Sequence, residues 1–437
     1  MSDFKNLDRL LQKYVDDGLP NCSCMIAKKG EILYENYFGW ADKENTVPLT
    51  ADHVFRQASL TKIAMYTTGM MLYEQGRFLM SDPLYEYFPE FRHSTKIIQL
   101  PNGTLEEVPV EHPITVKQIF NMTCGLPYEM IIGGIPVHHP TAKAMADEMK
   151  ALRANGYFTL RDQIKAAARV PLAFEPGTRF LYGFASELTA GLLEVLCDKP
   201  AEQVIKEMLF EPLDMDSSAN FLFGDLESRL VKNYYLKPGK TLADPDCLTV
   251  PDKVHEASFV GPLGTVPGFA RVITNCRDYT KLMQMLANGG IHNGEHILGR
   301  KTIDLIRTNT LTPTMIKEDF SNDYLAGYGY GYGMRTLMNR YEGQHNGMLG
   351  QFGWIGAILM GIVYIRIFVS FTNSKSIRFD LKAFLYATFA QFVIHAIGSG
   401  IITSSSGMLG FVAIALASQV EVDKDVSIRL PKIKISF

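Results

Sequence analysis

The chain is long, apolar enough to fold and nearly neutral, and these properties exclude several classes of protein. Its 437 residues are 47% hydrophobic and 20% charged, so it can bury a full core and is not intrinsically disordered. The formal net charge is -3 and no block of Lys and Arg occurs, so we expect no nucleic-acid partner. The six cysteines lack the spacing of metal ligands, which favours reduced thiols and predicts no metal site.

The N-terminal segment predicts a helix followed by a β-hairpin. Residues 4–14 carry apolar side chains at helical spacing and lack the apolar core of a signal peptide, so we expect a cytoplasmic protein. The apolar runs 22–28 and 31–38 are then separated by a turn at Gly30, which is typical of two antiparallel strands.

The stretch 55–76 carries the first candidate for chemistry. Ser59 and Lys62 stand three residues apart at the start of a predicted helix, a spacing that places both side chains on one face. A serine hydroxyl becomes nucleophilic when a base takes its proton, and a lysine amine in a dry pocket can do so. The spacing alone does not identify Ser59 as a nucleophile, because Ser2 and Lys5 have the same spacing at the chain terminus, where no pocket is expected.

The middle of the chain predicts a second hairpin and several helices. Asn102 and Gly103 lie between two alternating runs within 95–110, which is a strong hairpin signal. Helices are expected within residues 114–128 (ending at Gly125 and Pro127), 141–168 and 171–196.

Tyr182 lies where a loop meets the last of these helices. The helix is expected to bury Leu188, Leu192 and Val195, and loops on rigid elements often position functional groups. Farther on, residues 324–350 are rich in Gly and Tyr and return to strand character. Glycine at this density indicates backbone that passes close to a ligand or another strand.

Five segments occur in an order that identifies a family resemblance. They read F-R-Q-A-S-L-T-K, I-T-V-K-Q-I-F-N-M-T-C-G-L-P, F-E-P-G-T-R-F-L-Y-G-F, L-A-N-G-G-I-H-N-G-E-H-I-L-G-R-K-T and Q-H-N-G-M-L-G-Q-F-G. From about Phe4 to Ala357 the chain resembles the serine β-lactamase-related hydrolases. That group joins class C β-lactamases, D-alanyl-D-alanine carboxypeptidases, D-aminopeptidases and family VIII carboxylesterases.

The resemblance implies four catalytic residues, Ser59, Lys62, Tyr182 and His345. Ser59 would be the acylated nucleophile, Lys62 would take its proton, and Tyr182 matches the tyrosine of the family's Y-x-N element. Tyr182 and Lys62 would share the proton between attack and departure of the leaving group.

The resemblance also implies a third element that lines the pocket. His345, Asn346 and Gly347 match the K-T-G of lactamases, which is often H-x-G in the esterase and peptidase branches. The backbone N–H of Met348 would join that of Ser59 as an oxyanion hole.

Two departures from the lactamase pattern bear on the substrate. Phe184 replaces the asparagine of Y-x-N, which removes an amide and makes the predicted pocket more apolar. His345 replaces lysine and is a weaker clamp for a substrate carboxylate near pH 7. Among small-molecule esters, amides and lactams, these changes favour an ester or an uncharged acyl group over penicillin.

The tail, residues 358–437, departs from the family. Residues 383–420 contain no Asp, Glu, Lys or Arg, which is compatible either with a buried closing helix or with a membrane segment. The first reading is favoured, and membrane anchoring through this stretch is the alternative to a cytoplasmic location.

The fold expected from these features is α/β, of the α+β type. An antiparallel sheet flanked by helices would be built from residues 1–80 and 311–437, with a mainly helical lobe inserted at 81–310. The predicted function is an acyl-enzyme serine hydrolase without metal or organic cofactor, esterase-like or D-amino-acid amidase- or peptidase-like, with weak β-lactamase activity. The alternative is a non-catalytic binding or assembly module, motivated by Phe184 and the tail.

Overall fold

The computed structural model describes most of the chain up to residue 354 and one strand beyond it. The described residues are 4–128, 139–154, 156, 158–220, 224–237, 240–242, 244, 247–249, 272–320, 325–343, 348–354 and 411–415. The predicted third element, His345 to Gly347, and the predicted tail apart from 411–415 lie outside them.

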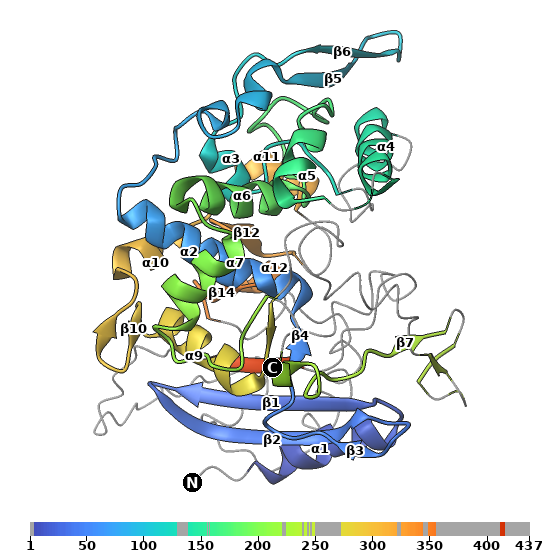
Figure 1. Ribbon diagram of the computed structural model, residues 1–437, viewed down its shortest axis with the longest axis vertical. Coiled ribbons are helices and arrows are strands. Elements are labelled where there is room, and N and C mark those ends of the chain that lie inside the picture. Colours follow the sequence, from blue (N-terminus) through green and yellow to red (C-terminus); the bar gives the residue numbers. More distant parts are fainter. Residues whose placement is uncertain are drawn as a thin grey trace, which may run out of the picture.

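A four-stranded sheet forms one end of the molecule (Figure 1). Its order is β15, β1, β2, β3, with bounds Phe411–Ala415, Asn21–Lys28, Glu31–Asp42 and Val47–Pro48. The antiparallel hairpin of β1 and β2 confirms the predicted turn at Gly30, whose φ of 86° suits glycine.

Strand β15 lies within the charge-free stretch 383–420, for which the sequence favours a buried closing helix over a membrane segment. At Phe411–Ala415 the structure instead shows a strand that pairs in parallel with β1, and the rest of the stretch lies outside the described residues. The physical reason is local and tertiary: Val412 and Ile414 favour extended backbone, and β1 offers an unpaired edge. Within the described residues, no helix combines the length and the apolar character needed to cross a membrane.

Two helices pack against this sheet. Helix α1 (Lys5–Asp16) contacts β1 and β2, and α9 (Cys276–Ala287) contacts β1 and β15. Leu7, Leu11 and Tyr14 are the buried face of α1, as the spacing predicted.

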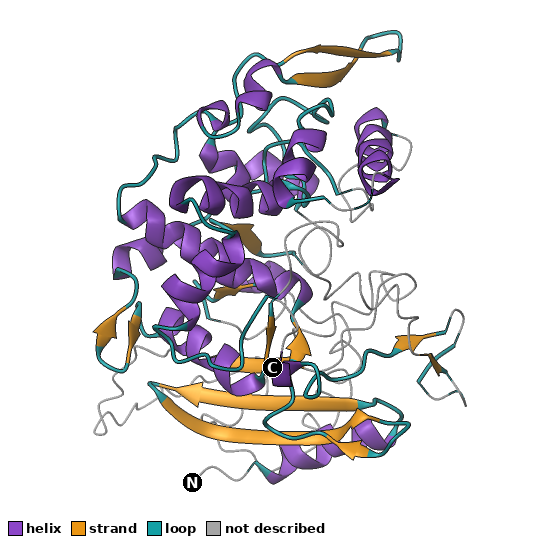
Figure 2. Cartoon of the chain, in the orientation of Figure 1, coloured by secondary structure: helices purple, strands orange, loops and turns teal. Residues whose placement is uncertain are grey.

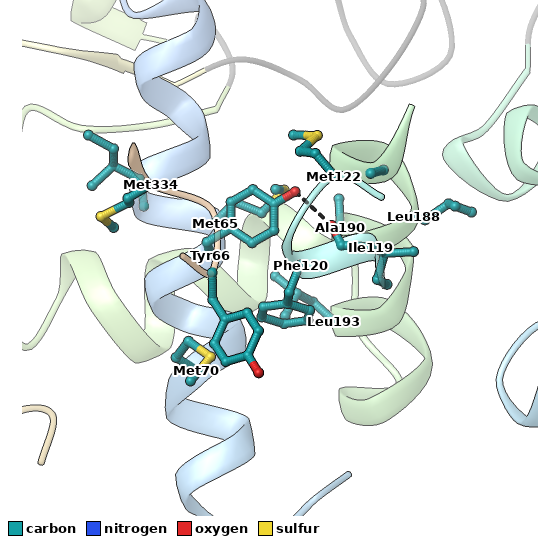
Figure 3. Close-up of a cluster of buried hydrophobic side chains, with 14 of the residues drawn as sticks. Met65, Tyr66, Met70, Ile119, Phe120, Met122, Leu188, Ala190, Leu193 and Met334 are labelled. Atoms are coloured by element: carbon teal, nitrogen blue, oxygen red, sulfur yellow. Dashed lines mark hydrogen bonds between the residues drawn. The ribbon is translucent and has the colours of Figure 1, made fainter. Parts of the chain in front are cut away.

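Helix α2 (Thr61–Glu74) crosses the middle of the molecule and is buried on nearly all sides. It packs against α6 (Ala185–Cys197) and α7 (Ala201–Ile205). Figure 3 shows apolar side chains of α2 and α6 together with Ile119 and Phe120, and the Tyr66 hydroxyl donates to the carbonyl of Ile119. Figure 2 shows most helices gathered away from the main sheet. The other helices are α3 (Val116–Phe120), α4 (Pro140–Ala154), α5 (Leu160–Ala167), α10 (Arg300–Ile306), α11 (Pro313–Asp319) and α12 (Arg340–Gly343).

The remaining strands form small antiparallel pairs and one three-stranded sheet. The hairpin predicted at Asn102-Gly103 is present and projects from the helical end in Figure 1. The pairs are β4 (Phe55–Arg56) with β9 (Ile273–Thr274), β5 (Thr95–Gln99) with β6 (Leu105–Pro109), β7 (Tyr235–Leu236) with β8 (Leu248–Thr249), and β10 (Ile291–His292) with β11 (Glu295–His296). The three-stranded sheet joins β12 (Tyr328–Tyr330), β13 (Arg335–Leu337) and β14 (Phe352–Gly353).

Two details of the helices differ from the sequence-based expectation. Helix α3 ends at Phe120, before Gly125, because Met122 has a φ of 60° and its carbonyl accepts a hydrogen bond from the Leu181 N–H. Val195 is 45% exposed, so the buried face of α6 rests on Leu188 and Leu192 without it. The backbone bond to Leu181 overrides the helix signal at the end of α3, and the apolar face of α6 is narrower than its sequence pattern suggested.

The division into two lobes at residues 81 and 311 stays a prediction. Helix α9 lies inside the segment 81–310, yet it packs against the main sheet. The predicted insert therefore contributes a helix to the sheet end of the molecule.

Candidate active site

Ser59 lies in the single 3-10 turn Ala58–Leu60 that leads into α2. Strand pairing fixes this turn from one side, since the Gln57 N–H donates to the carbonyl of Val272 at 2.8 Å. The hydroxyl of Thr61 accepts from the Val272 N–H at 2.9 Å, and Tyr279 donates to the Leu60 carbonyl at 3.1 Å. The half-buried serine therefore stands on a firmly held helix start.

The structure brings Ser59, Lys62 and Tyr182 together. The Tyr182 hydroxyl donates to Ser59 Oγ at 2.9 Å, although the two residues are 123 positions apart. Lys62 Nζ lies 4.9 Å from the centre of the Tyr182 ring, and Lys62 is only 8% exposed. A serine hydroxyl, a phenol and a nearly buried amine thus share one small region.

Tyr182 is positioned by backbone contacts on both sides. The N–H groups of Leu181 and Phe184 donate to the carbonyls of Met122 and Leu126, at 2.8 and 3.0 Å. These bonds tie the segment before α6 to the loop that follows α3, and they hold the tyrosine across from the start of α2.

A buried carboxylate at the end of α11 anchors the same segment. Asp319, whose side chain is 2% exposed, accepts from the Phe180 N–H at 3.0 Å and from Nε of Arg179 at 3.0 Å. The ring of Phe180 packs edge-on against Phe320. The position of Tyr182 therefore depends on α11 as well.

Two aromatic residues that the sequence did not single out flank the three. Tyr128 lies 5.5 Å from Lys62 Nζ by its ring centre and meets the Tyr182 ring edge-on. Trp354 stacks on Tyr182 with ring centres 5.1 Å apart and 13° between the planes. Neither had a local signal beyond its place in the segments C-G-L-P-Y and Q-F-G-W, which adjoin the matched motifs.

Two further tyrosines near the site stay neutral. Burial raises the pKa of Tyr66 well above its ordinary value, and the carboxylate of Glu187 raises it further. Burial likewise raises the pKa of Tyr330, whose ring packs against Trp354. Both are scaffold phenols rather than acids or bases at neutral pH.

Of the other predicted site residues, the structure describes Phe184 and Met348. Phe184 is 4% exposed and belongs to the main hydrophobic core, at the residue before α6. Met348 is described and half-buried, whereas His345, Asn346 and Gly347 lie outside the described residues. Among the described residues, no three His, Cys, Asp or Glu side chains form a metal site.

Comparison with known proteins assigns the chain to a family. The Beta-lactamase family profile matches residues 7–381. The chain belongs to the beta-lactamase family. This confirms the resemblance drawn from the five segments, and members of the family are generally serine hydrolases.

Individual relatives of this beta-lactamase family chain are distant but extensive. Protein Rv1367c of Mycobacterium tuberculosis is 24% identical over 342 residues, covering 76% of this chain and 79% of its own length. Esterase EstB of Burkholderia gladioli is 26% identical over 191 residues, 44% of each chain. The structure of EstCE1, a hydrolase with promiscuous acyltransferase activity, aligns with a TM-score of 0.63 at 21% identity, covering 81% of this chain and 87% of its own. The structural likeness confirms the expected α/β, β-lactamase-like fold.

Proposed function

We propose that this beta-lactamase family protein is a serine hydrolase that works through an acyl-enzyme on Ser59. The observation that carries the proposal is the 2.9 Å hydrogen bond from Tyr182 to Ser59 Oγ, with Lys62 Nζ over the same tyrosine ring. A nucleophile that is hydrogen-bonded to a phenol, with an amine beside the phenol ring, supplies the parts that acyl transfer requires.

The proposed reaction has two halves. In the first, Ser59 Oγ bonds to the carbonyl carbon of the substrate and its proton passes to the pair Lys62 and Tyr182. The bond to the leaving alcohol then breaks, and that pair returns a proton to the departing oxygen. In the second half, water loses a proton to the same pair and attacks the acyl-enzyme, which releases the carboxylic acid and restores the Ser59 hydroxyl.

The backbone N–H groups of Ser59 and Met348 would stabilise the negative charge on the carbonyl oxygen. Ser59 stands at a helix start, where N–H groups favour such charge. The third element, His345 to Gly347, would complete the pocket. Lys62 and Tyr182 share the proton, and His345 would contribute as a polar group beside the substrate.

The proposed substrates are small-molecule esters with an uncharged acyl group. Tyr182, which contacts Ser59, packs against two further aromatic rings, those of Tyr128 and Trp354. Phe184 brings no amide to grip a lactam, and the relative EstB is named as an esterase. Amidase- or D-peptidase-like activity and weak β-lactamase activity are the neighbouring reactions of the same site.

A fluorophosphonate probe tests the proposal, since it phosphonylates only an activated serine. We expect the full chain to be labelled at Ser59, and labelling to vanish in Ser59→Ala. Ser2→Ala is the matched control, because Ser2 and Lys5 have the same spacing, and it should label like the unaltered chain. A chain that does not label would be the non-catalytic module instead.

The preference for esters has a separate test. We expect hydrolysis of p-nitrophenyl butyrate to be faster than hydrolysis of nitrocefin at equal concentration. Faster nitrocefin turnover would contradict the ester preference while leaving the serine mechanism intact.

A further inference from the structure

A short chain of side-chain hydrogen bonds runs from the site to the first turn of α6. The Ser186 hydroxyl lies 2.6 Å from the Tyr128 hydroxyl and donates to Glu187 Oε2 at 2.7 Å. Ser186 is 4% exposed, so the middle of this hydrogen-bonded series is shielded from water, while Tyr128 and Glu187 at its ends are half-buried. None of these three residues is among the catalytic residues matched to the family motifs.

The direction of donation along these hydrogen bonds follows from the carboxylate of Glu187, at which the series ends. An ionised carboxylate accepts hydrogen bonds only, and a serine hydroxyl has one proton to give. The carbonyl of Gly183 is the other acceptor near Ser186, but it lies at 3.4 Å, well beyond the 2.7 Å of the carboxylate. While Glu187 is ionised, the Ser186 proton points to Glu187, and Tyr128 must donate to Ser186.

This direction matters for Lys62. Tyr128 presents its ring to Lys62 Nζ at 5.5 Å and its edge to the Tyr182 ring at 5.8 Å between centres. A phenol that donates its proton toward a carboxylate is polarised, and its ring attracts a cation more strongly. The charge of Glu187 also reaches the buried Tyr66 on α2, so it acts on the α2 side of α6.

We propose that Glu187 is a positioning residue of the site: through Ser186 it fixes Tyr128, and the Tyr128 ring holds Lys62 beside Ser59 and Tyr182. Glu187 touches neither substrate nor nucleophile in this scheme. The inference rests on the proposed function, because it assigns Lys62 a part in activating Ser59. It adds residues of α6 and of the 125–128 loop to the machinery.

The test measures the rate of fluorophosphonate labelling of Ser59 against probe concentration. Glu187→Gln keeps an oxygen that can accept from Ser186 but adds an N–H donor, so the direction of the hydrogen bonds is no longer fixed. We expect the rate at saturating probe to fall about tenfold, because Lys62 loses its alignment. The half-saturating probe concentration should not change, since the binding surface is intact. Glu194→Gln is the matched control: Glu194 lies seven residues on along α6, about 10 Å away, and its carboxylate bonds the Ala201 N–H.

A double variant separates a shared positioning role from two unrelated structural effects on the labelling rate. Tyr128→Phe should lower the saturating rate like Glu187→Gln. The two together should be no slower than either alone, because one removes an end of the hydrogen-bonded series and the other removes the charge that directs it. Effects that multiply would overturn the inference. If Glu187→Gln does not fold, Ser186→Ala breaks the same chain by removing one oxygen and should show the same loss.

The outcomes distinguish this inference from the proposed function. A labelled unaltered chain with an equally fast Glu187→Gln variant overturns only the role of Glu187. A chain whose Ser59 is never labelled overturns the proposed function and the inference with it.

Discussion

Replacement of Tyr182 by phenylalanine separates a structural hydrogen bond from a catalytic proton transfer. The change removes one hydroxyl, which donates to Ser59 Oγ at 2.9 Å, and keeps the ring that stacks on Trp354. A neutral hydrogen bond contributes about 1 kcal/mol net, so the free energy of unfolding should fall by about that amount. If the hydroxyl were only a structural bond, the loss in rate would be about fivefold.

The proposed proton transfer predicts a much larger loss. General acid–base groups contribute about 10²–10⁴ in rate, or roughly 3–5 kcal/mol of barrier. We therefore expect kcat/KM of Tyr182→Phe on p-nitrophenyl butyrate to fall at least about a hundredfold, with a urea melt near that of the unaltered chain. A variant that keeps more than about a fifth of the rate would refute the role of Tyr182 as a proton carrier.

A second tyrosine provides the control for this experiment. Tyr330 is fully buried, its ring packs edge-on against Trp354, and its hydroxyl makes no hydrogen bond with the described residues. Tyr330→Phe should leave the rate unchanged and hold or raise the free energy of unfolding, because a buried unpaired hydroxyl costs about 1–3 kcal/mol. The same chemical change at two neighbouring tyrosines thus has opposite expected results.

Two further predictions concern buried carboxylates. Asp319→Ala should lower the free energy of unfolding by about 1–3 kcal/mol in urea melts, because it leaves the Phe180 N–H without its acceptor, whereas the half-exposed Arg179 guanidinium regains water; Asp319→Asn should cost less. Burial raises the pKa of Glu202 to about 7 from 4.5, so its contribution to stability is full below about pH 4.5 and is lost as the pH rises through 7. Urea melts at about pH 5 and pH 8 should therefore show a loss of about 2–3 kcal/mol that Glu202→Gln abolishes, and an equal pH dependence in both proteins would contradict this.

The elements that the sequence predicted well are those with a strong local signal. The turns at Gly30 and Asn102-Gly103 have residues that suit positive φ and are flanked by strand-like runs, so both hairpins formed where expected. The helix after Ser59 likewise begins and ends near its predicted bounds. In each case the deciding interactions lie within about a dozen residues.

The parts that the sequence missed depend on contacts between distant segments. Tyr128 and Trp354 are ordinary aromatic residues locally, and they reach the site only because loops far apart in the chain converge on Tyr182. Strand β15 could not be foreseen from its own residues, since an apolar run of this length suits a strand or a helix, and the free edge of β1 decides. The family resemblance supplied the order of the motifs, but not these neighbours.

The position of Tyr182 relative to Ser59 is set by three hydrogen bonds from two segments, the end of α11 and the loop after α3, rather than by regular structure. Asp319 holds the Phe180 N–H, and the carbonyls of Met122 and Leu126 hold the next residues along. Met122 and Leu126 belong to one loop and Asp319 to another segment, so neither segment alone fixes the hydroxyl. Asp319→Asn keeps an oxygen for the Phe180 N–H but weakens the bond to Arg179. It should therefore lower kcat on p-nitrophenyl butyrate more than it raises KM, whereas a change confined to substrate binding would raise KM alone.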